Sequence, residues 1–156
     1  MTGYIAGFEP AMRAALAQAV APEAGSRPDV PVGAIVLDPA GAIIGGGRNE
    51  RESGSDPTAH AEVVALRAAG KARQTWRLDG CTLVVTLEPC TMCAGALLAG
   101  RVSRLVYGAA DARAGAAGSV WDVLHDPRLG PTVEVISGVL ADECAALLRG
   151  FFGELR

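Results

Sequence analysis

The sequence predicts an α/β fold of three layers, α/β/α, built around a mixed five-stranded sheet. Short apolar runs of strand length recur along the chain, and after an opening pair of strands they alternate with segments whose apolar residues repeat at helical spacing. A tight turn makes the first two strands antiparallel, whereas strands joined through helices favour parallel neighbours. The 156 residues, half of them hydrophobic, are enough for one domain with a buried core.

In the first half of the chain the pattern predicts a helix, a pair of strands and a second helix. Met12, Leu16 and Val20 recur every four residues, which places them on one face of the first helix. Thr58 is the expected N-cap of the second helix, and Gly70 is expected to end it. The expected elements are a helix over about 8–21, a loop over 22–31, a strand over 32–37, a turn over 38–41, a strand over 42–47 and a helix over 59–69.

Glycines are frequent in the two strands of this hairpin. Gly33 lies in the first strand, and Gly45, Gly46 and Gly47 are consecutive in the second. Glycine inside a strand indicates either a β-bulge or a close approach of the backbone to a ligand. Both interpretations fit the sequence.

The second half of the chain predicts three more strands and two main helices. The segment Thr-Leu-Val-Val-Thr-Leu over 82–87 is apolar enough to be buried on both faces of a sheet. The final helix has an apolar face formed by Cys144, Leu147, Leu148 and Phe151. The expected elements are a loop over 71–80, a strand over 82–87, a short helix over 89–98 that Gly100 ends, a strand over 104–107, a Gly- and Ala-rich segment over 109–131 with a short helix over 119–124, a strand over 132–136 and a helix over about 142–152.

The composition favours a folded cytoplasmic protein without a membrane partner. The formal net charge of −3 gives no general basic surface for nonspecific nucleic-acid binding, although local basic residues could still recognise RNA. The first residues lack the basic start and apolar core of a signal peptide, and no apolar run approaches the roughly 18 residues that cross a membrane. Four cysteines in such a chain favour reduced thiols and a metal site over disulfides.

Two short motifs predict a metal site. His60 lies two residues before Glu62, and Cys90 and Cys93 form a Cys-x-x-Cys pair directly after Pro89. Each motif is expected in the first turn of a helix, where free N–H groups favour the thiolate form of cysteine. One imidazole and two thiolates suit zinc, and three protein ligands leave the fourth tetrahedral position for water, as in catalytic sites. We therefore expect His60, Cys90 and Cys93 to bind one Zn²⁺.

Glu62 is the expected acid–base residue, on the same helix as His60 but not a ligand. Two thiolates cancel the formal charge of Zn²⁺ and weaken it as a Lewis acid, so that a neighbouring base gains importance. Glu62 would take a proton from the attacking water and deliver protons to a ring nitrogen and to the departing amine of a nucleobase. A structural zinc site would need a fourth ligand such as Cys81 or Cys144, but both lie in apolar patterns that indicate the core.

The pair of motifs, His-x-Glu and Pro-Cys-x-x-Cys, is the signature of zinc-dependent nucleobase deaminases. On these residues the chain resembles the cytidine deaminase-like superfamily and, within it, the bacterial tRNA-specific adenosine deaminases. The resemblance covers about residues 12–152, and the segment over 111–119 is the part that separates this family from deaminases of free bases and nucleosides. It implies a cytidine deaminase-like α/β/α fold and a single CMP/dCMP-type deaminase domain over 1–156. The resembling segments lie at 30–34, 56–62, 87–96, 111–122 and 140–152.

The resemblance also implies a reaction and partners. It implies conversion of adenosine to inosine at the wobble position of a tRNA anticodon, with the tRNA anticodon stem-loop as partner. A homodimer and a fifth strand parallel to the fourth are implied as well. By position, Asn49 would hydrogen-bond the target nucleotide and Asp111 would contact the ribose near the flipped base. Candidate phosphate contacts are Arg113 first, and then Arg48, Arg51, Lys71, Arg73, Arg77 and Arg101.

Two other functions stay open from the residues alone. A deaminase of a free base or nucleoside, such as guanine, cytosine or cytidine, could use the same zinc and glutamate. A non-catalytic RNA-binding module could use zinc for stability alone. Turnover of a free base would favour the first function, and indifference to Glu62→Gln would favour the second.

Overall fold

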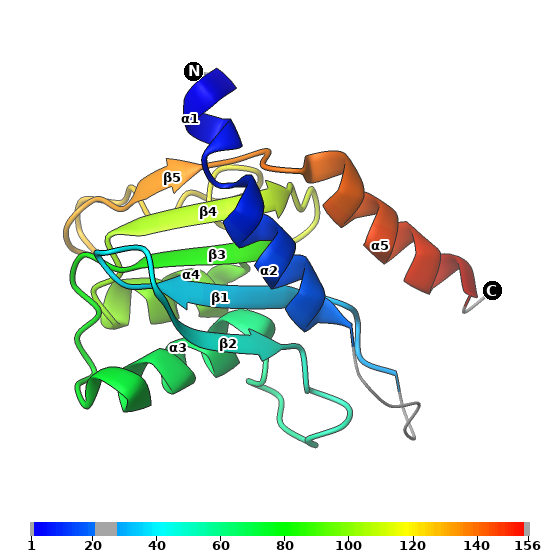
Figure 1. Ribbon diagram of the computed structural model, residues 1–156, viewed down its shortest axis with the longest axis horizontal. Helices are drawn as coiled ribbons and strands as arrows, with labels where there is room; N and C mark the ends of the chain where they lie inside the picture. Colours follow the sequence, from blue (N-terminus) through cyan, green and yellow to red (C-terminus); the bar gives the residue numbers. More distant parts are fainter. Residues whose placement is uncertain (1, 21–27, 155–156) are drawn as a thin grey trace.

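The structure, a computed structural model, describes residues 2–20 and 28–154 (Figure 1). Residues 22–27 of the predicted first loop, and Ala21 of the predicted first helix, lie outside the described residues. The helices and strands, in chain order, are α1 (Thr2–Ala6), α2 (Glu9–Ala19), β1 (Gly33–Leu37), β2 (Ile43–Arg48), α3 (Ala61–Arg73), β3 (Thr82–Leu87), α4 (Thr91–Ala99), β4 (Arg104–Ala109), β5 (Glu134–Ile136) and α5 (Ala141–Glu154).

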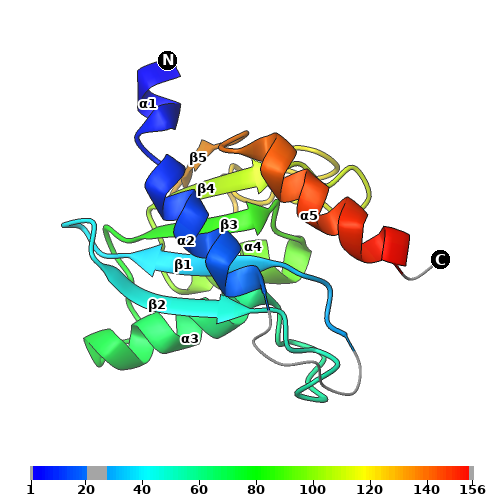
Figure 2. The ribbon, with the colours of Figure 1, turned by 45° about the vertical axis from the view of Figure 1, so that its right-hand side comes forward.

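The strands form a mixed five-stranded sheet in the order β2-β1-β3-β4-β5. β1 is antiparallel to both of its neighbours, whereas β3, β4 and β5 run parallel. The mixed sheet and the parallel fifth strand are therefore confirmed. Because parallel strands end at the same edge of a sheet, the segments that follow β3 and β4 lie side by side (Figure 2).

Helices cover both faces of the sheet, which confirms the three layers. α2 and α5 pack on one face, and α3 and α4 pack on the other (Figure 1). β3 contributes to both cores because its side chains alternate: Leu83 and Val85 pack with α3 and α4, and Val84 packs with α2 and α5. All three are fully buried, as the unbroken apolar run predicted.

The hairpin glycines let helices pack closely on the sheet. A Cβ at Gly33 would lie 1.9 Å from the carbonyl oxygen of Ala15 in α2, and one at Gly45 would lie 2.6 Å from that of Ala65 in α3. Gly33 pairs in regular register with Arg48, whereas Gly45 borders an irregularity, because the register shifts between its partner Val36 and Leu37. The β-bulge interpretation therefore holds next to Gly45, whereas at Gly33 the close partner is a helix of the same chain and not a ligand.

The two ends of α3 differ from the prediction. Thr58 is not the N-cap: its backbone N–H and its hydroxyl both donate to Asp56 Oδ1, at 2.8 Å, and His60 occupies the cap position. The helix also continues past Gly70 to Arg73 and ends where Gln74 adopts a left-handed conformation, with φ of 54°. Glycine inside a helix costs only about 1 kcal/mol, which surrounding packing can offset.

The predicted short helix over 119–124 is wrong. This segment contains turns and an isolated bridge between Ala117 and Asp122. The backbone N–H groups of Ala117 and Ser119 donate to the carboxylate of Glu88, so they are bound by a side chain from elsewhere in the chain.

The sequence also gave no prediction of α1. Among the described residues, no helix combines the length and apolarity needed to span a bilayer.

Candidate metal centre

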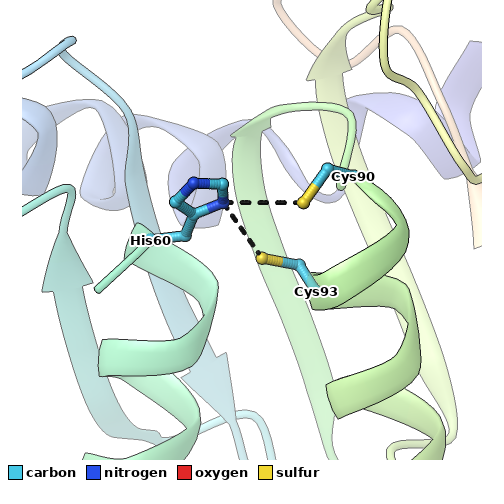
Figure 3. Close-up of side chains that lie close together, drawn as sticks. All are labelled: His60, Cys90 and Cys93. Atoms are coloured by element: carbon cyan, nitrogen blue, oxygen red, sulfur yellow. Dashed lines mark hydrogen bonds between the residues drawn. The ribbon is translucent and has the colours of Figure 1, made fainter. Parts of the chain in front are cut away.

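His60, Cys90 and Cys93 meet beside the ends of β2 and β3, at the starts of two helices (Figure 3). His60 is the N-cap of α3 and Cys90 is the N-cap of α4, while Cys93 lies in the first turn of α4. The prediction placed all three in first turns, but α3 and α4 begin two residues later than expected, so His60 and Cys90 come directly before the first turns. A loop leads into α3, and strand β3 leads into α4. The starts of these two helices therefore bring His60 and the two cysteines, which are distant in sequence, to one point.

The geometry of these side chains fits zinc. His60 Nδ1 lies 3.6 Å from Cys90 Sγ and 3.5 Å from Cys93 Sγ. Zinc bonds of about 2.3 Å to sulfur and about 2.0–2.1 Å to nitrogen, at the tetrahedral angle, correspond to a nitrogen–sulfur separation of about 3.6 Å. Among the described residues, no other group of three His, Cys, Asp or Glu side chains comes together in this way.

The two thiols differ in acidity. A hydrogen bond from the Cys93 thiol lowers the pKa of Cys90 to about 4. The same hydrogen bond raises the pKa of Cys93, and burial adds to the effect. The hydrogen bond to Cys90 also raises the pKa of His60. A metal ion binds the deprotonated forms, so a dication at this point displaces the protons that the three groups share.

Glu62 lies next to the cluster in the first turn of α3, and only 4% of its surface is exposed. Burial raises the pKa of Glu62 to about 7, partly offset by a backbone hydrogen bond and the charge of His60. A carboxyl group with this pKa both accepts and donates protons near neutral pH, which general acid–base catalysis requires. Glu62 therefore lies close to the predicted metal ligands but outside their cluster, as expected, and its acid–base role stays a prediction.

A cavity of about 200 Å³ opens beside the cluster. Its size and mixed lining suit a small planar group held by a few polar contacts. Both predicted substrate-binding residues, Asn49 and Asp111, line it together with His60 and Cys90 of the metal cluster. The lining residues are Val30, Val32, Asn49, Arg51, His60, Ala61, Glu62, Leu87, Glu88, Cys90, Asp111 and Ala114.

Asn49 and Asp111 are held in place by backbone contacts. The amide of Asn49 donates to the carbonyl of Val30 at 3.2 Å, and its oxygen accepts the N–H of Arg51 at 3.2 Å. Asp111 Oδ1 accepts the N–H groups of Arg113 and Ala114, at 2.9 and 3.1 Å. Each side chain thus reaches the cavity with a restricted orientation.

Glu88 is a site residue to which the sequence gave no role. It follows β3 directly, lines the cavity, and is 2% exposed. Its carboxylate accepts hydrogen bonds from the segment over 111–119. The sequence signal for a role of Glu88 was its position between a fully apolar strand and the Cys-x-x-Cys pair. An acidic residue at such a position is expected to be buried, and acidic residues are seldom fully buried without partners.

Four of the seven predicted phosphate contacts differ in their surroundings. Arg51 lines the cavity, and Arg113 is exposed on the segment over 111–119. Arg77 and Arg101 bind groups of their own chain, Asp79 and the carbonyl of Leu98. Of these four residues, only Arg51 lines the cavity.

A mixed sheet with a His-Cys-Cys cluster and a buried glutamate at the end of its strands is the arrangement of zinc-dependent nucleobase deaminases. The sequence profile of the cytidine and deoxycytidylate deaminase zinc-binding region matches residues 9–109, which include the whole cluster and Glu62. The chain belongs to this deaminase family.

Within the family, the chain is similar to enzymes named for tRNA. It is 52% identical over 128 residues to the tRNA-specific adenosine deaminase of Haemophilus influenzae, which covers 82% of this chain and 74% of that protein. It also resembles a structure from a study of A-to-I editing by tRNA:A34 deaminases at the wobble position of transfer RNA. That match has a TM-score of 0.80 and 40% identity, over 88% of this chain and 97% of that one.

A guanine deaminase also shares the fold. The guanine deaminase of Nitrosomonas europaea matches with a TM-score of 0.70 and 27% identity, over 96% of this chain and 82% of that one. Sequence identity therefore places the chain nearer to the tRNA-directed enzymes than to this free-base enzyme.

Proposed function

We propose that the protein is a zinc-dependent hydrolase that converts adenosine to inosine at the wobble position of a tRNA anticodon. The observation that carries the substrate is the 52% identity to the Haemophilus influenzae enzyme over most of both chains. The chemistry is supported by the metal cluster, by the buried Glu62 and by the cavity that Glu62 lines together with His60 and Cys90.

In this proposal His60, Cys90 and Cys93 hold one zinc ion per chain. The distances of 3.5 and 3.6 Å from the imidazole nitrogen to the two sulfurs support it. Zinc in such a site supplies a Lewis acid that brings the pKa of water toward neutrality. Cys81 and Cys144 are buried in the hydrophobic cores, which agrees with their expected role outside the metal centre.

Glu62 moves the protons of the reaction. It accepts a proton from the water that attacks the amino-bearing carbon of adenine, and gives that proton to the adjacent ring nitrogen. It then accepts the second proton of the water and transfers it to the amine, which leaves as ammonia. A pKa of about 7 suits a group that must alternate between both protonation states.

Asn49 and Asp111 orient the substrate. Asn49, held by Val30 and Arg51, hydrogen-bonds the target nucleotide, and Asp111 contacts its ribose. Arg113 and Arg51 are the proposed phosphate contacts, because one lies on the exposed loop next to Asp111 and the other lines the cavity.

The proposed partners are the anticodon stem-loop and a second copy of the chain. We propose one deaminase domain over 1–156, a homodimer and a cytoplasmic location. The similarity over 88% of this chain to a tRNA:A34 deaminase structure supports the single domain. Light scattering tests the dimer: an active monomer at micromolar concentration would contradict it.

The reaction is tested by incubating the protein separately with anticodon stem-loop RNA that carries a wobble adenosine, and with adenosine, guanine, cytosine and cytidine. We expect inosine in the RNA. Turnover of guanine or cytosine with inert RNA would contradict the proposed substrate and favour a free-base deaminase. Turnover of the RNA that is unchanged in Glu62→Gln would contradict the proposed mechanism.

A further inference from the structure

Glu88 connects the metal centre to the loop over 111–119. It lies between the last residue of β3 and the metal-ligand pair, two residues before Cys90. Its carboxylate is 2% exposed, and none of the ion pairs among the described residues involves it. A buried carboxylate is costly unless it is hydrogen-bonded, so its partners determine whether the site is stable.

Among the described residues, the hydrogen-bond donors to the Glu88 carboxylate all come from one loop. Oε2 accepts the backbone N–H of Asp111 at 2.9 Å and the hydroxyl of Ser119. Oε1 accepts the backbone N–H groups of Ala117 and Ser119, at 3.1 and 3.0 Å. Four donors saturate the lone pairs of a carboxylate, so the loop is wrapped around this side chain.

The loop approaches Glu88 too closely for a larger residue at its centre. A Cβ at Gly115 would lie 2.4 Å from Glu88 Oε2 and 2.5 Å from the carbonyl oxygen of Asp111. Two backbone hydrogen bonds hold the Glu88–Pro89 segment beside β4 and the loop. The N–H of Glu88 donates to the carbonyl of Ala109 at 2.9 Å, and the N–H of Ala116 donates to the carbonyl of Pro89 at 2.8 Å. The position of Asp111 relative to Cys90 is thus set through the Glu88–Pro89 segment.

We propose that Glu88 is a positioning residue that holds Asp111 at the rim of the cavity and so determines the affinity for the ribose of the target nucleotide. This inference rests on the proposed function, because it needs a substrate with a ribose. Glu88 does not touch the substrate: it acts through the backbone N–H of Asp111, whose own carboxylate is already oriented by Arg113 and Ala114.

Glu88→Gln tests the proposal with almost no change of shape. The amide NH₂ can still donate to the hydroxyl of Ser119, but it opposes the N–H of Asp111, so one hydrogen bond is lost at that position. We expect KM for the stem-loop to rise about tenfold, with kcat changed much less and one zinc per chain retained. Ser119→Ala removes a single donor to the same oxygen and should raise KM by a smaller factor.

A double-mutant cycle with Asp111→Ala separates positioning from general stability. If Glu88 acts through Asp111, Glu88→Gln should have little further effect on KM once Asp111→Ala is present. Thr86→Val is the matched control: Thr86 is buried in β3, two residues before Glu88, and accepts the N–H of Gly33 at 3.2 Å, away from the loop. Thr86→Val should lower thermal stability, and its effect on KM should be independent of Asp111→Ala.

The outcomes are distinguishable. If the wild type turns over the stem-loop and folded, zinc-loaded Glu88→Gln has an unchanged KM, this inference alone is overturned. The same holds if Glu88→Gln raises KM by the same factor with and without Asp111→Ala. Wild-type turnover of a free base and not of RNA overturns the proposed function, and the inference with it. If Glu88→Gln does not fold, the cycle of Ser119→Ala with Asp111→Ala decides by the same criterion.

Discussion

The metal centre and the loop over 111–119 are built in opposite ways. In the metal centre, three side chains from two helix starts converge on a point where a cation fits. In the loop, three backbone N–H groups and one hydroxyl converge on a single anionic side chain, Glu88. The first arrangement depends on residue identity at each ligand, whereas the second depends on backbone shape around one residue.

This difference separates the chemistry of the site from its specificity. Changes among the side chains of the metal centre should abolish deamination. Changes in the loop should leave zinc and the chemical step in place and weaken the binding of the nucleotide. Each substitution below tests one side of this contrast.

The largest effect is expected at the metal. His60→Ala removes the nitrogen ligand, so we expect loss of bound zinc and no measurable deamination. Elemental analysis of the purified variant gives the zinc content per chain. His125→Ala is the matched control, because His125 binds Asp122 and the carbonyl of Val133 outside the metal centre. Full zinc in His60→Ala would refute its role as a ligand.

Glu62→Gln should have the next largest effect. The variant keeps the three ligands but cannot carry protons, so the rate of deamination should fall by about 10²–10⁴-fold with zinc retained. Single-turnover kinetics on the stem-loop, together with zinc analysis, measure both quantities. Glu143→Gln, which changes an exposed carboxylate paired with Arg13, should leave the rate unchanged.

Gly115→Ala tests the loop side of the contrast. The added methyl group collides with Glu88, and overpacking of this kind costs about 1–3 kcal/mol of stability. We expect normal zinc content, a lower melting temperature and a raised KM for the stem-loop. Gly95→Ala in α4 is the control, because nothing lies within 4 Å of its added Cβ. An unchanged KM in folded Gly115→Ala would show that the loop does not set substrate affinity.

The smallest effect is expected away from both regions. Burial raises the pKa of the Cys144 thiol from its ordinary value near 9 to about 11. Below pH 9 the thiol is neutral in both states, so it has no effect on stability. Between about pH 9 and 11 the unfolded thiol ionises first, and the free energy of unfolding falls. Urea titrations across this range should give a steeper loss for the wild type than for Cys144→Ala; equal slopes would contradict the raised pKa.

The metal centre was predictable because its spacing is local. Cys90 and Cys93 lie three residues apart, and His60 and Glu62 lie two apart, so each pair is fixed by one helix start. The strand over 82–87 was predicted with its bounds, since a run that is apolar throughout has few other solutions. The layered fold followed from the same periodicities.

The rest depends on contacts that are distant in sequence. The segment over 119–124 is not helical because Ala117 and Ser119 donate to Glu88, which lies 29 and 31 residues earlier. Gly33 and Gly45 are required by helices that pack across the sheet. No local pattern encodes these partners.

The central claim is that the cavity beside the metal centre deaminates an adenosine presented by RNA. It is tested most directly by incubating the zinc-loaded protein with an anticodon stem-loop that carries a wobble adenosine and, in parallel, with guanine. We predict stoichiometric conversion of the wobble adenosine to inosine and no turnover of guanine. Release of ammonia from guanine, with the stem-loop adenosine intact, would contradict the account.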